Sequence, residues 1–209
     1  LFQGFFGTSA TNVTVAGNFL GTDPSGSITL SGGAYGVILD TQGGSVSGTI
    51  GGTSSGDRNL IPGNLTGINI GGNFNGGSTI AIQGNIIGLD KTASVPLPNS
   101  RGISIGALAP ALDTIGGITP GAGNIIAGNT VFGIVVSAST SIATIRGNSI
   151  HDNGSLGIEL GDDNVVTPND AGRIDDGGNG VPHFPIVPSF QTRAPGGPGN
   201  PTSVPPPSR

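Results

Sequence analysis

The segment from Asp162 to Asn179 is the densest cluster in this sequence of side chains that could do chemistry. Its five carboxylates are interleaved with Asn and Gly residues: Asp162, Asp163, Asp170, Asp175 and Asp176. Oxygen ligands on a flexible backbone suit Ca²⁺, whereas zinc is disfavoured because the chain has no Cys and only two His residues. The spacing does not match an EF-hand loop. The segment predicts a Ca²⁺ site, and the alternative is an acidic solvated loop in which Asp and Asn cap turns.

A pair of carboxylates outside this segment would suggest glycoside hydrolysis. Asp23 and Asp90 occupy equivalent positions, five residues after the Asn of a recurring phrase, and Asn153 occupies the third such position. Glycosidases place their two carboxyl groups roughly 5 to 9.5 Å apart. The coil count derived below puts this pair three coils apart, on the order of 14 Å at about 4.8 Å per coil. We therefore expect each Asp to cap the turn that begins its own loop.

The composition indicates many short strands joined by tight turns. The 209 residues include 41 Gly, only 9% are charged, and 34% are apolar. The net charge is -5 and the seven basic residues are scattered, so we expect no nucleic-acid partner. No apolar run approaches the roughly 20 residues of a transmembrane helix.

A Gly-Asn phrase with an apolar residue two positions after the Asn recurs at long, regular intervals. It places Asn at positions 18, 85 and 148, so that the two intervals are nearly equal, and further Gly-Asn pairs end at Asn64 and Asn129. Thr-Ile-Gly-Gly recurs at 49–52 and 114–117. Dividing each long period by three predicts a solenoid of roughly eight coils of about 21–22 residues. Insertions are confined to the stretch after the Gly-Asn phrase, which predicts loops on one side.

Apolar residues alternate within each coil, which favours strands over helices. We expect one set of positions to face inward: Val15, Val37, Ile82, Ile103, Ile145 and Ile158. A single coil cannot bury its own apolar face, so the coils must stack. The fold class is therefore all-β, a parallel β-helix.

The repeats resemble those of the right-handed parallel β-helices of the pectate-lyase-like superfamily. They are most similar to those of bacterial surface proteins with Gly-Asn-x-Ile-Gly-Thr-Asp and Thr-Ile-Gly-Gly repeats, here at 17–23, 84–90 and the two Thr-Ile-Gly-Gly segments. The resemblance covers roughly residues 8–187. It implies a secreted or surface-displayed protein, and the architecture itself hosts enzymes, adhesins and ice binders.

Enzymatic activity is the main alternative that this resemblance raises. A polysaccharide lyase would need a base such as Arg101 or Arg146, and a hydrolase would draw on Asp23, Asp40, Asp90 or Asp113. No cluster of acids accompanies the two Arg residues. His151 and His183 are isolated, no nucleophile motif is present, and Tyr35 is the single Tyr in a chain without Trp. We therefore expect no catalytic residues and no required cofactor other than the possible Ca²⁺.

The sequence divides into three parts. Residues 1–10 are either a tag remnant or a partial first coil, residues 11–187 are expected to form the β-helix, and the Pro- and Gly-rich residues 188–209 a linker or tail of a longer parent protein with further modules. The expected function is that of a non-catalytic rigid spacer or an adhesion surface for a polysaccharide or cell-surface ligand. Ice binding is a further alternative. It needs columns of Thr on a flat face, and the Thr residues do not align at the predicted coil length.

Overall fold

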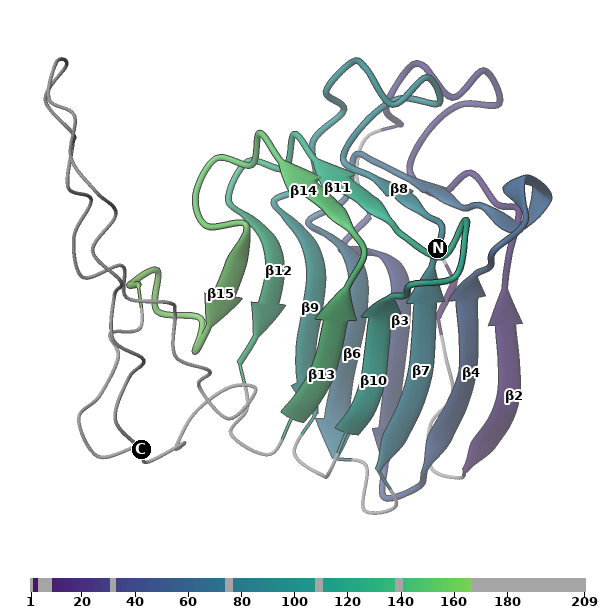
Figure 1. Ribbon diagram of the computed structural model, residues 1–209, viewed down its shortest axis with the longest axis vertical. Coiled ribbons are helices and arrows are strands. Elements are labelled where there is room, and N and C mark those ends of the chain that lie inside the picture. The colour runs from purple at the N-terminus through teal and green to yellow at the C-terminus, as the bar shows by residue number, and fades with distance from the viewer. Residues whose placement is uncertain are drawn as a thin grey trace, which may run out of the picture.

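Three parallel β-sheets wind around one apolar core in the computed structural model (Figure 1). The structure describes residues 2–3, 9–30, 33–73, 77–107, 111–137 and 141–166. Within these ranges the helical content is one 3-10 turn, η1 (Ser55–Asp57). No helix in the described part of the chain is long and apolar enough to cross a membrane.

Each sheet is built from strands that recur once per turn. Sheet A contains β1 (Phe2–Gln3), β3 (Tyr35–Gln42), β6 (Thr66–Asn73), β9 (Arg101–Ala107), β12 (Phe132–Val136) and β15 (Ile158–Leu160). Sheet B contains β2 (Ala10–Val15), β4 (Val46–Gly51), β7 (Ser78–Gln83), β10 (Ala111–Gly116) and β13 (Ser141–Arg146). Sheet C contains β5 (Leu60–Ile61), β8 (Ile86–Ile87), β11 (Ile125–Ala127) and β14 (Ser149–His151).

The solenoid has about four turns, so the prediction of a parallel β-solenoid is confirmed and the prediction of eight coils is wrong. Four complete sets of three strands run from β4 to β15, preceded by β2 and β3. Adjacent strands of sheet B align Ile50, Ile82, Ile115 and Ile145, which fixes the length of a turn. Each turn is about half as long again as the sequence predicted.

The error arises because each turn carries two Asn corners. Asn18, Asn85 and Asn148 lie at one corner, between sheets B and C, whereas Asn64 and Asn129 lie at another, between sheets C and A. The long interval between equivalent Gly-Asn phrases thus spans two turns of two corners each. Dividing this interval by three treated Asn residues from the two different corners as equivalent positions of successive coils, and it therefore gave a coil length that is too short.

The core consists of inward-facing Ile, Val and Leu residues from sheets A, B and C. Val15, Val37, Ile82 and Ile103 are buried in it and Ile145 packs against it, as predicted. Ile158 belongs to the same inward column as Ile103, through Ile134, but is 42% exposed. It lies in β15, the last strand that the structure describes, so no further described turn covers it.

The segments expected to close the domain lie mostly outside the described residues. This applies to the end of the predicted β-helix, 167–187, and to the predicted tail, 188–209. In the first ten residues, β1 pairs with β3 through Phe2 and Val37 at the edge of sheet A.

Candidate functional site

The recurring Asn residues form a hydrogen-bonded ladder along the corner between sheets B and C. The Nδ2 of each Asn donates to the Oδ1 of the Asn one turn later, over 2.8–3.1 Å, through Asn18, Asn59, Asn85, Asn124 and Asn148. Most of these amides also donate to main-chain carbonyls of the sheet B strand one turn earlier; that of Asn85, for example, donates to the Ile50 carbonyl oxygen of β4. The predicted structural role of these residues is confirmed.

A second ladder runs along the corner between sheets C and A. It joins Asn64, Asn99, Asn129 and Asn153 over 2.9–3.3 Å. Many of the glycines before ladder Asn residues turn the chain with a left-handed φ, for example +67° at Gly84, where a Cβ would lie 2.2 Å from the Gly52 carbonyl oxygen. Asn59 and Asn99 follow Arg58 and Pro98 instead, so the Gly-Asn phrase did not reveal them.

Asp23 and Asp90 cap their own loops, as predicted. The Asp23 carboxylate accepts hydrogen bonds from the N–H groups of Ser27 and Ile28, and that of Asp90 accepts them from Ser94 and Val95. The Ser25 hydroxyl and these N–H groups outweigh desolvation and lower the pKa of Asp23 to about 2. Burial opposes ionisation of Asp90, but its hydrogen bonds outweigh burial and hold its pKa below the ordinary value.

Asp23 and Asp90 lie closer together than the sequence predicted. Asp23 and Asp90 lie two turns apart rather than three, which corresponds to about 10 Å at the usual strand spacing. The case against a dyad rests on their environment instead. A general acid needs a raised pKa, and both carboxylates have a lowered one.

The two long loops that contain these Asp residues pack against each other. The N–H of Lys91 donates to the Gly26 carbonyl oxygen at 3.0 Å. They meet because the intervening turn passes this corner with only three residues between Pro62 and Thr66. The loops project together beyond the sheets (Figure 1) and expose apolar side chains, namely Ile28, Leu30 and Val95.

A polar hollow of about 330 Å³ lies beside the start of sheet A, close to these loops. We call it the Tyr35 hollow. Asn69 and Ser104 alternate with inward Ile residues and so face outward into it. The described lining contains no carboxylate and consists of Tyr35, Leu65, Thr66, Asn69, Ser100, Arg101, Ser104 and Val131.

Arg101, one of the two predicted candidate bases, is held by an ion pair. Its guanidinium donates to the Asp162 carboxylate at 2.7 Å, with both side chains partly exposed. Arg146 lies on the outer side of sheet B, in β13, away from the hollow. His151 is exposed and paired with Asp152 at 2.9 Å, whereas His183 lies outside the described residues.

The remaining acid candidates do not form a catalytic group either. Asp40 lies in β3, opposite Gly71 of β6. Asp113 is buried in the interior, where it accepts hydrogen bonds from the Ile80 N–H at 2.8 Å and the Ser78 hydroxyl at 3.0 Å. Burial outweighs these bonds and raises the pKa of Asp113.

Glu159 is the acidic residue that the sequence analysis missed. It lies in β15, is fully buried, and neither of its carboxylate oxygens accepts a hydrogen bond. Burial raises the pKa of Glu159, the nearby main-chain N–H of Asp163 offsets part of this rise, and the charges of Asp163 and Asp162 add to it. In the sequence, Glu159 stands three residues before the acidic segment, which could have drawn attention to it. The alternating polarity of its strand instead indicates an ordinary polar residue.

The predicted Ca²⁺ ligands divide between described and undescribed residues. Asp162 and Asp163 lie in the turn after β15, whereas Asp170, Asp175 and Asp176 lie outside the described residues. Within the part of the chain that the structure describes, no three His, Cys, Asp or Glu side chains already form a metal cage.

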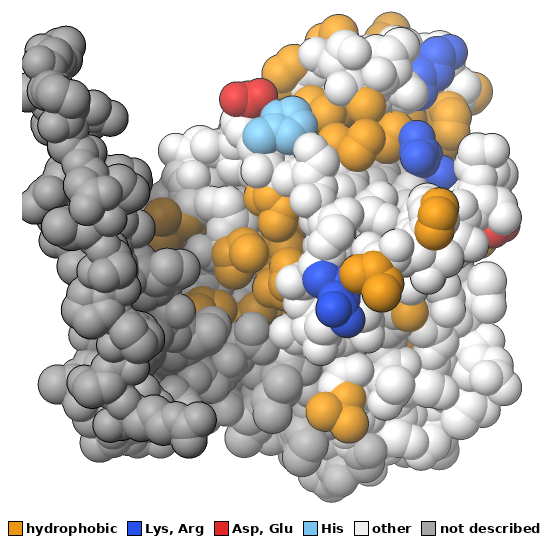
Figure 2. Space-filling model, viewed as in Figure 1, with side chains coloured by type: hydrophobic (Ala, Val, Ile, Leu, Met, Phe, Trp, Pro, Cys, Tyr) orange, Lys and Arg blue, Asp and Glu red, His pale blue; other side chains and the backbone are white. Residues whose placement is uncertain are grey.

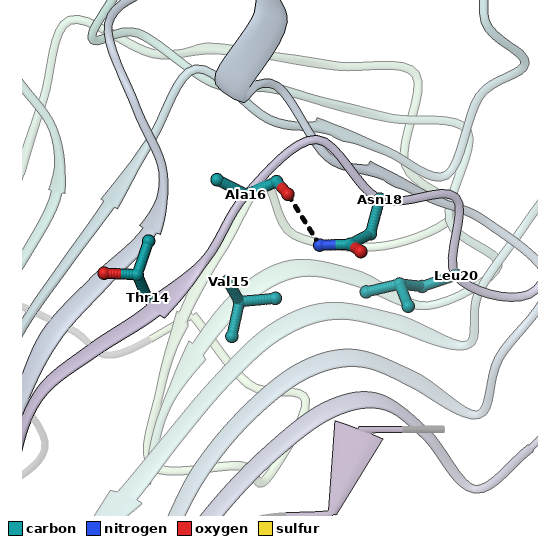
Figure 3. Close-up of a pocket in the computed structure, with 5 residues that line it drawn as sticks. All are labelled: Thr14, Val15, Ala16, Asn18 and Leu20. Atoms are coloured by element: carbon teal, nitrogen blue, oxygen red, sulfur yellow. Dashed lines mark hydrogen bonds between the residues drawn. The ribbon is translucent and has the colours of Figure 1, made fainter.

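A second hollow of about 330 Å³ lies at the N-terminal end of the solenoid (Figure 3). Thr14, Val15, Ala16, Asn18 and Leu20 line it, and the Asn18 amide donates to the Ala16 carbonyl oxygen at 2.8 Å. Because β2 is the edge strand of sheet B, this hollow is the end of the stack at the first rung of the first ladder.

The outer face of sheet B carries a column of Thr residues, contrary to the sequence analysis. Thr14 aligns with Thr49, and Thr114 with Thr144, with Ala81 between the two pairs. The alignment was missed because the coil length was wrong. Figure 2 views this face, on which charged side chains are few.

No protein-family model, no curated protein and no solved structure matches this chain. The fold and the sites therefore define its class, an all-β parallel solenoid with two Asn ladders.

Proposed function

We propose that this chain is a non-catalytic module of a secreted or surface-displayed protein, which binds a polysaccharide or cell-surface glycan at the Tyr35 hollow. The solenoid is taken to be right-handed, as in the pectate-lyase-like superfamily whose repeats it resembles, since parallel crossovers have this hand in nearly all proteins. The Asn ladders stiffen it, so it also serves as a spacer for further modules of its parent protein.

The composition of the Tyr35 hollow carries this proposal. It offers one aromatic face, from Tyr35, and a fixed row of amide and hydroxyl groups, from Asn69, Ser104 and Thr66. A mostly neutral set of donors and acceptors beside an aromatic ring suits hydroxyl-rich ligands, and its volume lies at the lower end of the usual range for ligand pockets. None of the described lining residues supplies a carboxylate for acid–base catalysis.

Binding and activity assays on the same samples test both halves of the proposal. Calorimetry against neutral and acidic oligosaccharides is expected to give binding without release of reducing ends or unsaturated uronate. Turnover that is abolished by Asp23→Asn, Asp40→Asn, Asp90→Asn or Asp113→Asn would instead establish an enzyme. Absence of binding to the whole panel would contradict the glycan ligand.

The Thr column favours ice binding as a second candidate function. Its residues lie on adjacent parallel strands, whose spacing of about 4.8 Å is regular. Thr14 and Thr144 are exposed and Thr49 and Thr114 half-buried, but Ala81 interrupts the column. Thermal hysteresis in the unmodified chain that is lost in the Thr114→Lys variant would support ice binding over glycan binding. The absence of hysteresis in the unmodified chain would remove this candidate.

A further inference from the structure

The end of β15 and the turn after it carry three carboxylates within five residues, at the C-terminal end of sheet A. Glu159 is followed by Asp162 and Asp163, whose charges act on the Glu159 carboxyl group. Asp162 is neutralised by Arg101, which donates to its Oδ1 at 2.7 Å. Glu159 and Asp163 have no cationic partner among the described residues, since the ion pairs there are those of Arg101 and His151.

The burial of the Glu159 carboxylate without a hydrogen-bond partner points to a ligand. Its side chain has no exposed surface, and both carboxylate oxygens are without a hydrogen-bond donor. A buried, unpaired carboxylate is strongly unfavourable, and proteins pair such groups or use them to coordinate metals. Asp113 and Asp90, the other buried acids among the described residues, each accept hydrogen bonds and need no such explanation.

We propose that Glu159 and Asp163 bind a Ca²⁺ ion, with main-chain oxygens of the 160–165 turn and water completing its coordination. Oxygen-only ligands select a hard cation, and the irregular turn suits the flexible coordination of Ca²⁺ better than the strict octahedron of Mg²⁺. Only two protein carboxylates take part, so we expect a dissociation constant on the order of 0.1–1 mM, the range of extracellular Ca²⁺ modules.

The proposal places the ion at the end of the outward column that also lines the Tyr35 hollow. Glu159 aligns with Val135, and Val135 with Ser104. The ion would fix the turn that holds Asp162 against Arg101. The site does not depend on what the hollow binds, so it stands or fails separately from the proposed function.

Thermal melting of the full 209-residue chain in CaCl₂ and in EDTA tests the site, with calorimetry for affinity. Ca²⁺ is expected to raise the Tm in proportion to the logarithm of its excess. Glu159→Gln, which keeps the shape and removes the charge, should weaken Ca²⁺ binding at least about tenfold, since even indirect ligand partners contribute about 10–100-fold. Asp57→Asn, a distant loss of one charge, should leave the Ca²⁺ shift unchanged.

A second variant keeps the test decisive if Glu159→Gln fails to fold. Asp163→Asn retains the Oδ1 that accepts the Val165 N–H, so it should fold and bind Ca²⁺ at least about tenfold more weakly. Identical melting curves of the unmodified chain in CaCl₂ and in EDTA would overturn the proposal. So would a Ca²⁺ shift that survives Glu159→Gln and Asp163→Asn but is lost in Asp170→Ala, because the ligands would then lie elsewhere in the acidic segment.

Discussion

The Asn85 amide donates a 2.9 Å hydrogen bond to the Oδ1 of Asn124, which lies one turn further along the solenoid. Both side chains are buried. Each therefore satisfies groups on two other turns that water cannot reach, and the repeat of Asn marks a continuous network rather than a row of independent turns.

Asn85→Ala is expected to destabilise the protein by about 2–4 kcal/mol, because it orphans the Ile50 carbonyl and the amides of its ladder neighbours. Asn18→Ala, at the exposed first rung, should lower the free energy of unfolding by less than about 1 kcal/mol. Urea unfolding of the two variants checks this. Equal losses would mean that the ladder does not act through burial.

Local rules predicted more of this structure than the global period did. Alternation identified the inward positions Val37 and Ile103, and turn chemistry identified the capping roles of Asp23 and Asp90, because each depends on a few neighbouring residues. The coil length depends on which Asn residues share a corner. That is decided by loop lengths which vary from turn to turn, and by Asn59, which lacks the preceding Gly.

The sites missed from the sequence depend on the same long-range register. Glu159 becomes notable only once it is buried beside Val135 without a donor, and Thr49 only once it aligns with Thr14 across a turn. Neither fact follows from spacing in the chain until the coil length is known.

Asp113→Asn is expected to stabilise the protein at neutral pH by about 1–3 kcal/mol, the usual scale for desolvating a polar group. Burial raises the folded-state pKa of Asp113 above the unfolded value of about 3.9. The stability that the protonated Asp113 carboxyl group contributes is therefore fully present below about pH 3.9, and it is lost as the pH rises through the folded-state pKa. Unfolding free energies of parent and variant at pH 3 to 8 should diverge as the pH rises. Parallel profiles would contradict a raised pKa.

Asp23 should show the opposite dependence. Its pKa is lowered to about 2, so its stabilising effect is present above the unfolded value of about 3.9 and is lost as the pH falls towards 2. Asp23→Ala should speed amide exchange at Ser27 and Ile28 more than at amides of the core strands, because this carboxylate accepts hydrogen bonds from the N–H groups of its own loop. An NMR titration giving an ordinary Asp pKa would refute the capping geometry.

Glycan binding by a matched pair of outward substitutions tests the central claim most directly. Ser104→Arg places a long side chain in the Tyr35 hollow, whereas Thr79→Arg places the same side chain on the outer side of sheet B. Calorimetry with the best oligosaccharide of the panel should show affinity reduced at least about tenfold in Ser104→Arg, a loss of about 1.4 kcal/mol. Thr79→Arg should bind like the parent. Unchanged affinity in a folded Ser104→Arg variant would contradict the assignment of the binding surface to this hollow.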